Sequence, residues 1–360
     1  MSDPRYASLD VGSNTIRLLI VERSGKEKIR PLRVERSITR LGGDYTKAKG
    51  LDPLAMNRTL KALQSFSRLI RAYRVQFVFG VATGVLREAK NRRSFLREVS
   101  RRTGLTLRLL SGQEEAHLML QGVLGSLKEI KPWLCVVDIG GWSTEILWVE
   151  KGVVRKTASV RLGTVELCEK FLKSDPPGAI EMKKLEKRVE GVLHDVIQKR
   201  REKGSVEKKG RGGLLGTAGT ITTLASIDLG LSVYDPGKIN GHCISRSRLS
   251  QILCHLRSLP ACERRRIPGL EMGREDLILS GAVIVLKIFD LLGLPEMMVV
   301  NSGLLEGVLM DGMSRLRKKK GKDSIEKLNL RAVHAGGWKE GCASFRKAAG
   351  TKSKAKKMVS

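Results

Sequence analysis

Two short stretches of the sequence place an acidic residue before a glycine turn, a pattern suited to holding phosphate. The first begins at Asp10 and reads "DVGSNT"; the second begins at Asp138 and reads "DIGGWS". Glycine lets the backbone approach a ligand closely and present N–H groups to oxygen anions. Either turn taken alone is equally typical of an ordinary hairpin. The phosphate interpretation therefore depends on the pattern occurring twice.

The two stretches belong to a longer internal repeat. Residues 10–22 align with residues 138–150 without a gap, preserving a strand, the acidic residue, the glycine and the next strand. This indicates duplication, with two strand–turn–strand hairpins facing each other across a cleft. The predicted phosphate-binding residues in the two turns are Gly12, Ser13, Asn14, Gly140, Gly141, Trp142 and Ser143.

The stretch "SGQEEAH" places two carboxylates at a helix start. Ser111 and Glu114 have the spacing of a capping box, which turns Glu114 back onto the backbone. Glu115 lies about 100° further round the helix and is left free. For His117, pairing with Glu114 is the simplest role.

Further candidates for binding phosphate follow predicted strands. Arg87 comes soon after one strand and could grip phosphate oxygens with two N–H groups; a solvated helix surface is the alternative. Thr83 ends the same strand. In "GTAGT", residues Gly216, Thr217 and Gly219 would shape a helix N-terminus able to receive phosphate or a nucleotide.

The segments around these residues predict an α/β protein. Residues 6–38 read as a three-stranded meander, and Asp52 and Pro53 are typical of a helix start. A strand over 75–83, a helix and a strand over 105–112 follow. Strands alternating with helices after a meander favour an α/β layer over a bundle.

The length and composition of the chain indicate how many domains it can form and what charge it carries. The chain has 360 residues, enough for two domains, and 67 Lys and Arg against 37 Asp and Glu give a net charge of +30. Residues 313–360 hold 15 basic and 3 acidic residues, so the remainder is basic too. We expect an anionic ligand, and a mostly disordered tail over 313–360 that can contact nucleic acid nonspecifically.

Several classes are disfavoured by the sequence. No apolar run is long enough to span a membrane and no signal segment is visible, so we expect a cytoplasmic protein. The six cysteines form no CxxC pair, which favours reduced thiols. The pairs His242-Cys243 and Cys254-His255 could supply zinc ligands, although their spacing fits no common finger.

Taken together, the motifs "LDVGSNTIRLLI", "VATGVLREAKN", "LLSGQEEAHLMLQGV", "VVDIGGWSTE", "LGTVELCEKF", "GTAGTITTLA" and "SGLLEGVL" resemble the exopolyphosphatase and guanosine pentaphosphate phosphohydrolase family. That family lies in the superfamily of actin, sugar kinases and heat-shock ATPases. The resemblance runs from about residue 7 to residue 312 and is closest to the short, two-domain form.

The resemblance implies two ribonuclease-H-like α/β domains related by duplication, over residues 1–126 and 127–312, with a cleft between them and a basic C-terminal tail over 313–360. It also implies a phosphohydrolase that uses Mg²⁺ or another divalent metal. The implied metal ligands are Asp10, Asp138 and Glu145, and the implied catalytic residues are Glu115 as general base, Arg87 and Glu145.

Three functions stay open at this point. The favoured one is an exopolyphosphatase that releases orthophosphate from linear polyphosphate, and the nearest rival is a guanosine pentaphosphate 5′-phosphohydrolase. A weakly catalytic protein that binds polyphosphate or nucleic acid is the third. The sequence leaves the oligomeric state open, with a homodimer as one option.

Trp142 bears on this choice because the family usually has glycine there. Its ring could act as a gate at the phosphate site or stack on a base, or it could pack at the domain interface. Few local partners are visible in the sequence to bury the ring, which tilts the expectation toward a gate. A left-handed backbone at this residue would cost about 1–2 kcal/mol.

Overall fold

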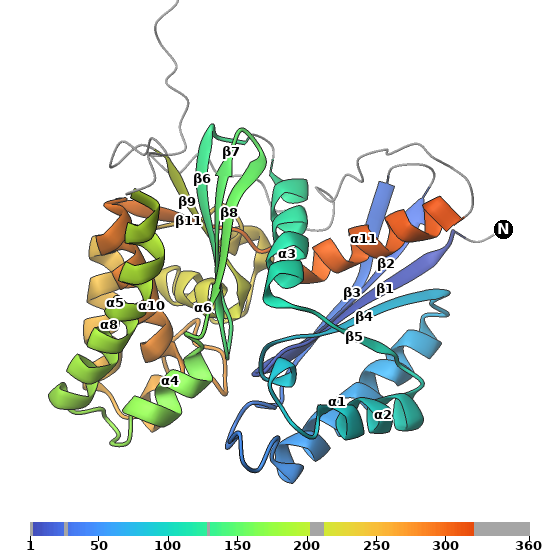
Figure 1. Ribbon diagram of the computed structural model, residues 1–360, viewed down its shortest axis with the longest axis horizontal. Coiled ribbons are helices and arrows are strands. Elements are labelled where there is room, and N and C mark those ends of the chain that lie inside the picture. Colours follow the sequence, from blue (N-terminus) through green and yellow to red (C-terminus); the bar gives the residue numbers. More distant parts are fainter. Residues whose placement is uncertain (1–2, 25–27, 128–129, 202–211, 320–360) are drawn as a thin grey trace, which may run out of the picture.

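The chain forms two β-sheets flanked by helices (Figure 1), as described by a computed structural model. The structure describes residues 3–24, 28–127, 130–201 and 212–319. Residues 320–360, most of the predicted tail, lie outside the described residues. The α/β class and the two-domain arrangement are confirmed.

The first sheet has the strand order β3-β2-β1-β4-β5. The first three strands form the predicted antiparallel meander, and β4 and β5 add to it in parallel. Its elements are β1 (Arg5–Val11), β2 (Thr15–Ser24), β3 (Lys28–Ile38), α1 (Pro53–Ala72), β4 (Phe77–Ala82), the 3-10 turn η1 (Gly84–Arg87), α2 (Arg92–Thr103), β5 (Leu107–Leu109) and α3 (Gly112–Ser126).

The second sheet has the order β10-β11-β9-β6-β7-β8. Read from β8, it repeats the first sheet: an antiparallel meander followed by two parallel strands. Its elements are β6 (Trp133–Ile139), β7 (Thr144–Glu150), β8 (Val153–Val160), α4 (Thr164–Phe171), α5 (Ala179–Arg201), β9 (Gly213–Thr217), α6 (Ala218–Asp228), α7 (Pro236–Ile239), β10 (Cys243–Ser245), α8 (Arg246–Ser258), α9 (Ala261–Arg264), α10 (Ile278–Leu292), β11 (Glu296–Val299) and α11 (Leu304–Lys319).

The two predicted helix starts follow local chemistry. The Asp52 side chain accepts a hydrogen bond from the Ala55 amide, and Pro53 occupies the first helical turn of α1. Ser111 and Glu114 form the complete capping box of α3. Because a cap fixes where a helix begins, the second box also fixes the direction in which Glu115 leaves the helix.

Helices α3 and α11 pair with each other and cross between the two halves. The helix α3 ends the first half yet packs on β7 and β8, whereas α11 ends the second half yet packs on β1, β2 and β4. Gly122 and Gly307 allow this pairing, since a methyl group at either would collide with a backbone carbonyl of the facing segment. The halves are therefore locked together by an exchange of their last helices.

This exchange corrects the predicted boundary at residues 312 and 313. The helix α11 continues to Lys319, and Met313 is buried with Leu309, Tyr6 and Leu19. The apolar residues at Leu305, Leu309 and Met313 recur every four positions and form one face of a helix. The C-terminal segment up to Lys319 thus belongs to the folded body, packed on the first sheet.

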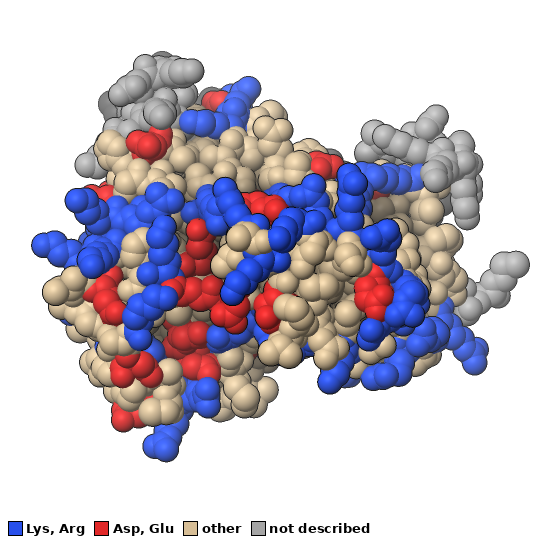
Figure 2. Space-filling model, turned by 60° about the horizontal axis from the view of Figure 1, so that its bottom comes forward, with Lys and Arg blue, Asp and Glu red and all other residues tan. Residues whose placement is uncertain are grey.

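The body of the protein is basic, as expected from its charge. Figure 2 shows Lys and Arg side chains spread over both lobes of the face that it presents, with the acidic side chains gathered mainly on the left lobe. None of the helices within the described ranges is long and apolar enough to cross a membrane.

Four cysteines are free thiols, namely Cys135, Cys168, Cys254 and Cys262. Cys243 is disulfide-bonded, which contradicts the expectation of reduced thiols at this residue. Over residues 3–24, 28–127, 130–201 and 212–319, no three His, Cys, Asp or Glu side chains form a metal-binding group. The zinc alternative thus has no support, and His242 instead contacts Asp228 at 2.7 Å.

Candidate active site

A cleft of about 420 Å³ lies where the two hairpin turns meet. Both halves supply its walls. Of the residues proposed from the sequence, it is lined by Asp10, Gly12, Ser13, Asn14, Thr83, Glu115, Asp138, Gly140, Gly141, Trp142, Ser143 and Gly219.

The two turns touch each other directly. A methyl group built on Gly141 would lie 3.0 Å from the Asn14 Cβ and 3.2 Å from its backbone nitrogen. Any larger residue at 141 would push the turns apart. Glycine is needed here for close approach, not for a left-handed backbone, because Gly141 does not have a positive φ.

The turns present unpaired backbone N–H groups to the cleft. Within the described part of the chain, the amides of Ser13, Asn14, Gly141 and Trp142 donate to no protein acceptor. The Ser13 hydroxyl accepts from the Val85 amide at 2.8 Å, which fixes the first turn against η1. Backbone N–H groups without a protein acceptor, gathered in two facing turns, are the kind of donors that can bind an oxyanion.

Asp10 is held in the first hairpin by an arginine. Asp10 and Arg17 face each other across β1 and β2, and the Arg17 guanidinium donates to Asp10 Oδ2 from Nε at 3.2 Å and from Nη2 at 2.8 Å. The other oxygen, Oδ1, is buried without a hydrogen-bond partner among the described residues. One oxygen of Asp10 is therefore left for a ligand.

The second hairpin pairs two carboxylates instead. Asp138 and Glu145 face each other across β6 and β7, and both are buried. Burial and then the charge of Glu145 raise the pKa of Asp138 to about 7. The pKa of Glu145 is also raised by burial, against hydrogen bonds from Ser159 and Ser143 that favour its charged form. Unlike Asp10 in the first hairpin, Asp138 faces a second carboxyl group across the strands and not an arginine.

Arg87 joins the two halves at this point. From the end of η1 its guanidinium donates to Glu115 Oε2 and, from Nη2, to the Ser143 hydroxyl at 2.9 Å. The same Nη2 lies 3.9 Å from Glu145 Oε1. Arg87 therefore reaches from the first half into the second turn.

Glu115 lines the cleft from the first turn of α3, with its side chain 12% exposed. Burial, and next the charge of Glu145, raise the pKa of Glu115 well above its ordinary value, although Arg87 acts in the other direction. A carboxylate with a raised pKa is a stronger base toward water.

Glu114 has a different environment from its neighbour. Its Oε2 accepts from the Ser111 amide and hydroxyl, both at 2.9 Å, and its Oε1 accepts from Arg108 at 2.8 Å. Glu114 does not line the cleft. His117 lies near the Gln121 side chain at 3.0 Å, not near Glu114.

Part of the "GTAGT" segment lies in a strand, and part of it lines the cleft. Gly216 lies in β9, where a methyl group would collide with Met297 and Ile221, and the Thr217 hydroxyl donates to the Ser302 carbonyl at 2.8 Å. Neither residue lines the cleft. Gly219 does, in the first turn of α6, next to Ala218, which has a φ of 72°.

Trp142 is buried as well as being part of the cleft wall. Its side chain packs in the core of the first half, and its Nε1 donates to Glu88 at 3.1 Å. Tyr45 meets the ring edge-on with centroids 5.0 Å apart, and the Arg161 guanidinium lies 4.8 Å from its centroid. Trp142 lacks a positive φ. The neighbouring residues do not bury the ring, as expected, but Tyr45, Glu88 and Arg161 from distant segments do.

Sequence reasoning gave no role to Arg17 or Arg274. Arg274 is buried at the cleft wall, where its Nη2 donates to the Thr15 hydroxyl of the first hairpin at 3.2 Å and its Nε donates to Glu271 at 2.7 Å. A methyl group at Gly219 would collide with this guanidinium. Arg17 could have been recognised from the sequence, because the alignment of the two repeats places it at the same position as Glu145.

The donor set at the hairpins fits a hard divalent cation. Asp10 has a buried oxygen with no partner among the described residues, and Asp10 is among the charges that raise the pKa of Asp138. A cation between these carboxylates would relieve that repulsion. Mg²⁺ commonly takes one or two carboxylates and keeps several waters. Within the described ranges, the three predicted ligands Asp10, Asp138 and Glu145 do not together form a metal-binding group.

Comparison with known proteins gives a consistent result. The Ppx/GppA phosphatase family matches residues 20–316. Exopolyphosphatase 2 of Mycobacterium tuberculosis is 29% identical over 322 residues, which cover 86% of this chain and 99% of that protein. A guanosine-5'-triphosphate,3'-diphosphate pyrophosphatase of Vibrio vulnificus is 27% identical over 321 residues, which cover 88% of this chain and 61% of that protein.

A bifunctional 3-dehydroquinate synthase/phosphatase of Fusobacterium nucleatum is 29% identical over 314 residues, and the match spans 85% of this chain but 46% of that protein. Among solved structures, the Aquifex aeolicus member of the Ppx/GppA family is similar, with a TM-score of 0.70 and 32% identity over 88% of this chain and 98% of that one.

Proposed function

Because the chain belongs to the Ppx/GppA phosphatase family, we propose that it hydrolyses the terminal phosphoanhydride bond of linear polyphosphate and releases orthophosphate. The observation that carries the proposal is the position of Glu115. A carboxylate of raised pKa lies in the same cleft as four unpaired backbone amides, with Arg87 beside it. Base, phosphate donors and a cationic side chain are thus brought together.

In this proposal, each group has a defined role. The amides of Ser13, Asn14, Gly141 and Trp142 bind the oxygens of the terminal phosphoryl group. Glu115 accepts a proton from the attacking water, whose oxygen forms a bond to phosphorus while the anhydride P–O bond breaks. The leaving oxygen remains on the shortened chain.

In this proposal, Arg87 orients both the base, Glu115, and the phosphoryl group. Its guanidinium contacts Glu115 and Ser143 and can transfer one of these hydrogen bonds to a phosphoryl oxygen. The terminal group would then be held between the two halves.

Mg²⁺ would be held by Asp10 and Asp138, with Glu145 next to them. When bound, it neutralises part of the charge of the phosphate oxygens. The two hydrogen bonds from Arg17 to Oδ2 fix the orientation of Asp10 and leave Oδ1 without a partner among the described residues.

A second candidate, guanosine pentaphosphate 5′-phosphohydrolase, is favoured by the far end of the cleft. The cleft is also lined by Pro31, Val34 and Tyr234, and the Arg36 guanidinium lies 4.3 Å from the centroid of the Tyr234 ring; the apolar side chains and this guanidinium suit a base. The charge of +30 favours the longer anion, polyphosphate. The weakly catalytic binding protein receives no support from Trp142, because its ring packs into the core of the first half.

The test is a phosphate-release assay on polyphosphate, guanosine pentaphosphate and ATP, each with Mg²⁺ and with a chelator. We expect the highest kcat/KM on polyphosphate, and phosphate release about 10²–10⁴ slower from Glu115→Gln. A higher kcat/KM on guanosine pentaphosphate would favour the second candidate, and release that is equal with and without Glu115 would refute the proposed mechanism.

A further inference from the structure

A second hollow, of about 720 Å³, lies on the outer surface between α4 and α5. Lys170 and Phe171 border it from the end of α4, and Lys184, Lys187, Arg188 and Gly191 border it from α5. It shares no residue with the cleft. We refer to it as the α4–α5 hollow.

The α4–α5 hollow is strongly cationic. Lys170, Lys184, Lys187 and Arg188 are exposed, and within the described ranges none of them forms an ion pair. Only one carboxylate, that of Asp195, borders the hollow. The field of four cations around one depression attracts a polyanion.

The spacing of these cations is unfavourable for the helix itself. Lys184 and Arg188 are four residues apart, and Lys187 lies three residues after Lys184, so like charges are neighbours along one face. Such pairs destabilise a helix. Glu190, which might have neutralised them, instead pairs with Lys287 of α10 at 2.9 Å. A bound anion would remove this repulsion.

Gly191 provides an independent observation. It lies in the middle of a 23-residue helix, where glycine is less favourable than alanine. Gly122 and Gly307 are explained by close helix contact, but a methyl group at Gly191 would meet no described atom within 4 Å. Packing of the described chain therefore gives no reason for glycine here, and its effect is to open the hollow down to the helix backbone.

The helix α4 connects the hollow to the cleft. At its start, the Thr164 and Val165 amides donate to the carbonyls of Gly140 and Gly141, at 3.0 and 2.9 Å. At its end, Lys170 and Phe171 border the hollow. Eight residues at 1.5 Å each make this distance about 12 Å along the helix.

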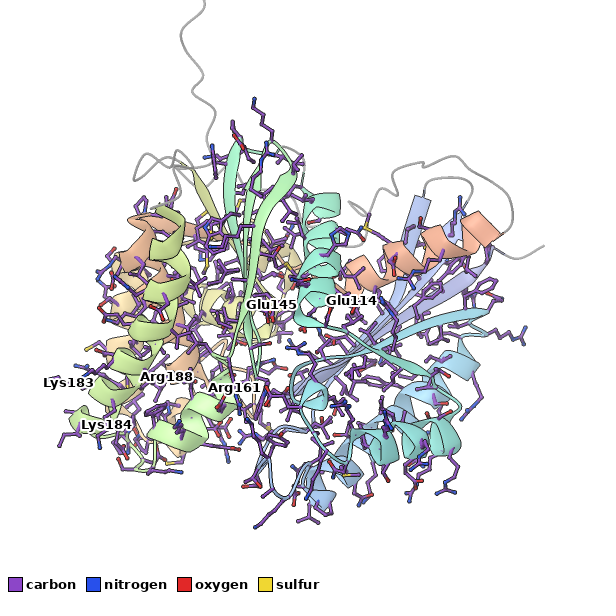
Figure 3. All side chains as sticks on the ribbon, viewed as in Figure 1. Glu114, Glu145, Arg161, Lys183, Lys184 and Arg188 are labelled. Carbon is purple, nitrogen blue, oxygen red and sulfur yellow. The ribbon has the colours of Figure 1, made fainter. Side chains whose placement is uncertain are left out.

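Cations continue along this route. Arg161, which contacts the Trp142 ring, also pairs with Glu166 of α4 at 2.9 Å. In Figure 3, Arg161, Arg188, Lys184 and Lys183 follow one another from the lower end of β8 across α5 to its outer edge. Arg161 pairs with Glu88 at 3.1 Å as well, so the cations on this route that lack an ion pair in the described ranges are those on α5 and at the end of α4.

We propose that the α4–α5 hollow binds the unreacted part of a polyphosphate chain whose terminal group lies in the cleft. This inference rests on the proposed function. A chain held at both places re-enters the cleft at a high effective concentration, whereas a chain too short to reach the hollow gains nothing. The hollow thus selects long substrates over short ones.

The first test reverses charge in the hollow with the double variant Lys184→Glu/Arg188→Glu. We expect Kd and KM for long-chain polyphosphate to rise about tenfold and the salt dependence of binding to weaken. The kcat, and kcat/KM for tripolyphosphate, should stay within about twofold, because the cleft is untouched. An equal loss on short and long chains would overturn the proposal.

A matched control separates the hollow from the overall charge of the protein. The double variant Lys61→Glu/Arg93→Glu makes the same change in net charge on α1 and α2 of the other half, at two exposed residues. We expect less than about a threefold effect on long-chain binding. If this control loses as much affinity as the hollow variant, nonspecific attraction accounts for the binding.

A second variant fills the hollow without changing its charge. Gly191→Leu introduces a large side chain at a position where leucine favours the helix, so the fold is maintained. We expect weaker binding of long-chain polyphosphate and an unchanged or higher Tm. Gly191→Ala, which adds only a methyl group, controls for helix propensity and should bind as the unaltered protein does. Unaltered binding in Gly191→Leu would contradict the proposal.

Binding is measured directly, by fluorescence anisotropy of labelled polyphosphate, so that failure of the proposed function is seen separately. Wild-type protein that binds polyphosphate through the hollow but releases no phosphate would refute the reaction and leave the binding site in place. A labelled single-stranded oligonucleotide is the competing ligand. If the charge-reversal variant loses oligonucleotide binding but keeps polyphosphate binding, the hollow is a nucleic-acid site and the proposal is wrong.

Discussion

The hairpin from Asp10 to Arg17 and the hairpin from Asp138 to Glu145 have the same register but differ in charge. In each, the acidic residue just before the end of the first strand faces a residue seven positions later, near the start of the next strand, which is Arg17 in the first hairpin and Glu145 in the second. The first pair is neutral and hydrogen-bonded, whereas the second consists of two buried carboxylates, with the pKa of Asp138 raised to about 7.

This difference assigns different tasks to the two turns. Both supply backbone amides, but only the second carries negative charge that a cation or Arg87 must balance. Glu115 and Arg87 come from the first half and yet face the second hairpin, and the charge of Glu145 helps raise the pKa of Glu115. The reacting groups therefore gather on the side of the second hairpin.

The largest expected effect follows from Glu115. Glu115→Gln should lower kcat by about 10²–10⁴, because the amide cannot accept the proton of the attacking water. Substrate binding should be largely kept, as measured by the Kd for polyphosphate in the absence of turnover. An unchanged kcat would mean that another group accepts the proton. It would contradict the conclusion that the reacting groups lie beside the second hairpin.

The third residue of each turn, Asn14 or Trp142, tests whether the turns differ in packing. Trp142→Gly should lower the free energy of unfolding by about 3–5 kcal/mol, because a buried ring is lost. The ratio of kcat/KM between polyphosphate and guanosine pentaphosphate should stay the same.

Asn14→Gly is the matched change in the first turn, and it should cost about 1 kcal/mol or less because little apolar volume is removed. Thermal unfolding and both specificity constants provide the readout. A shifted substrate ratio with an unchanged Tm in Trp142→Gly would instead identify the ring as a gate.

The charge difference itself predicts opposite effects of the same substitution. The pKa of Asp138 in the folded protein, about 7, exceeds its ordinary value of 3.8, so folding takes up a proton between these values. The stability contributed by this group is complete below about pH 4 and is lost as the pH rises through about 7. Asp138→Asn should therefore stabilise the metal-free protein at pH 8, by about 1–2 kcal/mol, and have less effect at pH 5.

Asp10→Asn should instead destabilise the metal-free protein by about 1–3 kcal/mol, because Arg17 loses its ionic partner in a buried site. Thermal unfolding with a chelator at pH 5 and pH 8 measures both variants. Effects of the same sign at pH 8 would mean that the two hairpins do not differ in charge balance.

The smallest effect is expected from Glu114, which lies beside the base but outside the cleft. Glu114→Gln should lower stability by about 1 kcal/mol, because the capping box and the Arg108 contact are weakened. The kcat should be unchanged. A fall in kcat comparable to that of Glu115→Gln would contradict the separation of cap and base.

Local spacing was enough to predict part of this arrangement. The two hairpin turns, the Asp52 cap and the capping box at Ser111 depend on residues within about seven positions of each other, and the structure has them as expected. The capping box also correctly separated Glu114 from the cleft. Such short-range patterns can be recognised in a sequence because the interaction partners are close to each other along the chain.

Contacts between distant segments were not predictable in the same way. Trp142 is buried by Tyr45 and Glu88, and Arg274 reaches Thr15 across 259 positions. Nothing in the sequence near these residues specifies the partner. The end of α11 is a different case. Its apolar face is visible in the sequence at Leu309 and Met313, but the basic composition after residue 312 favours the prediction of a tail.

The repeat of the two halves has a consequence in terms of symmetry. Two separate copies of one half, associated about a two-fold axis, would carry the same residue in both copies at the position that Arg17 and Glu145 occupy. Such a dimer would offer two guanidinium groups or two carboxylates, never one of each. Joining the halves in one chain removes this constraint. The two halves of one chain can therefore keep nearly the same fold while differing at this position, which holds a cation, Arg17, in the first half and an anion, Glu145, in the second.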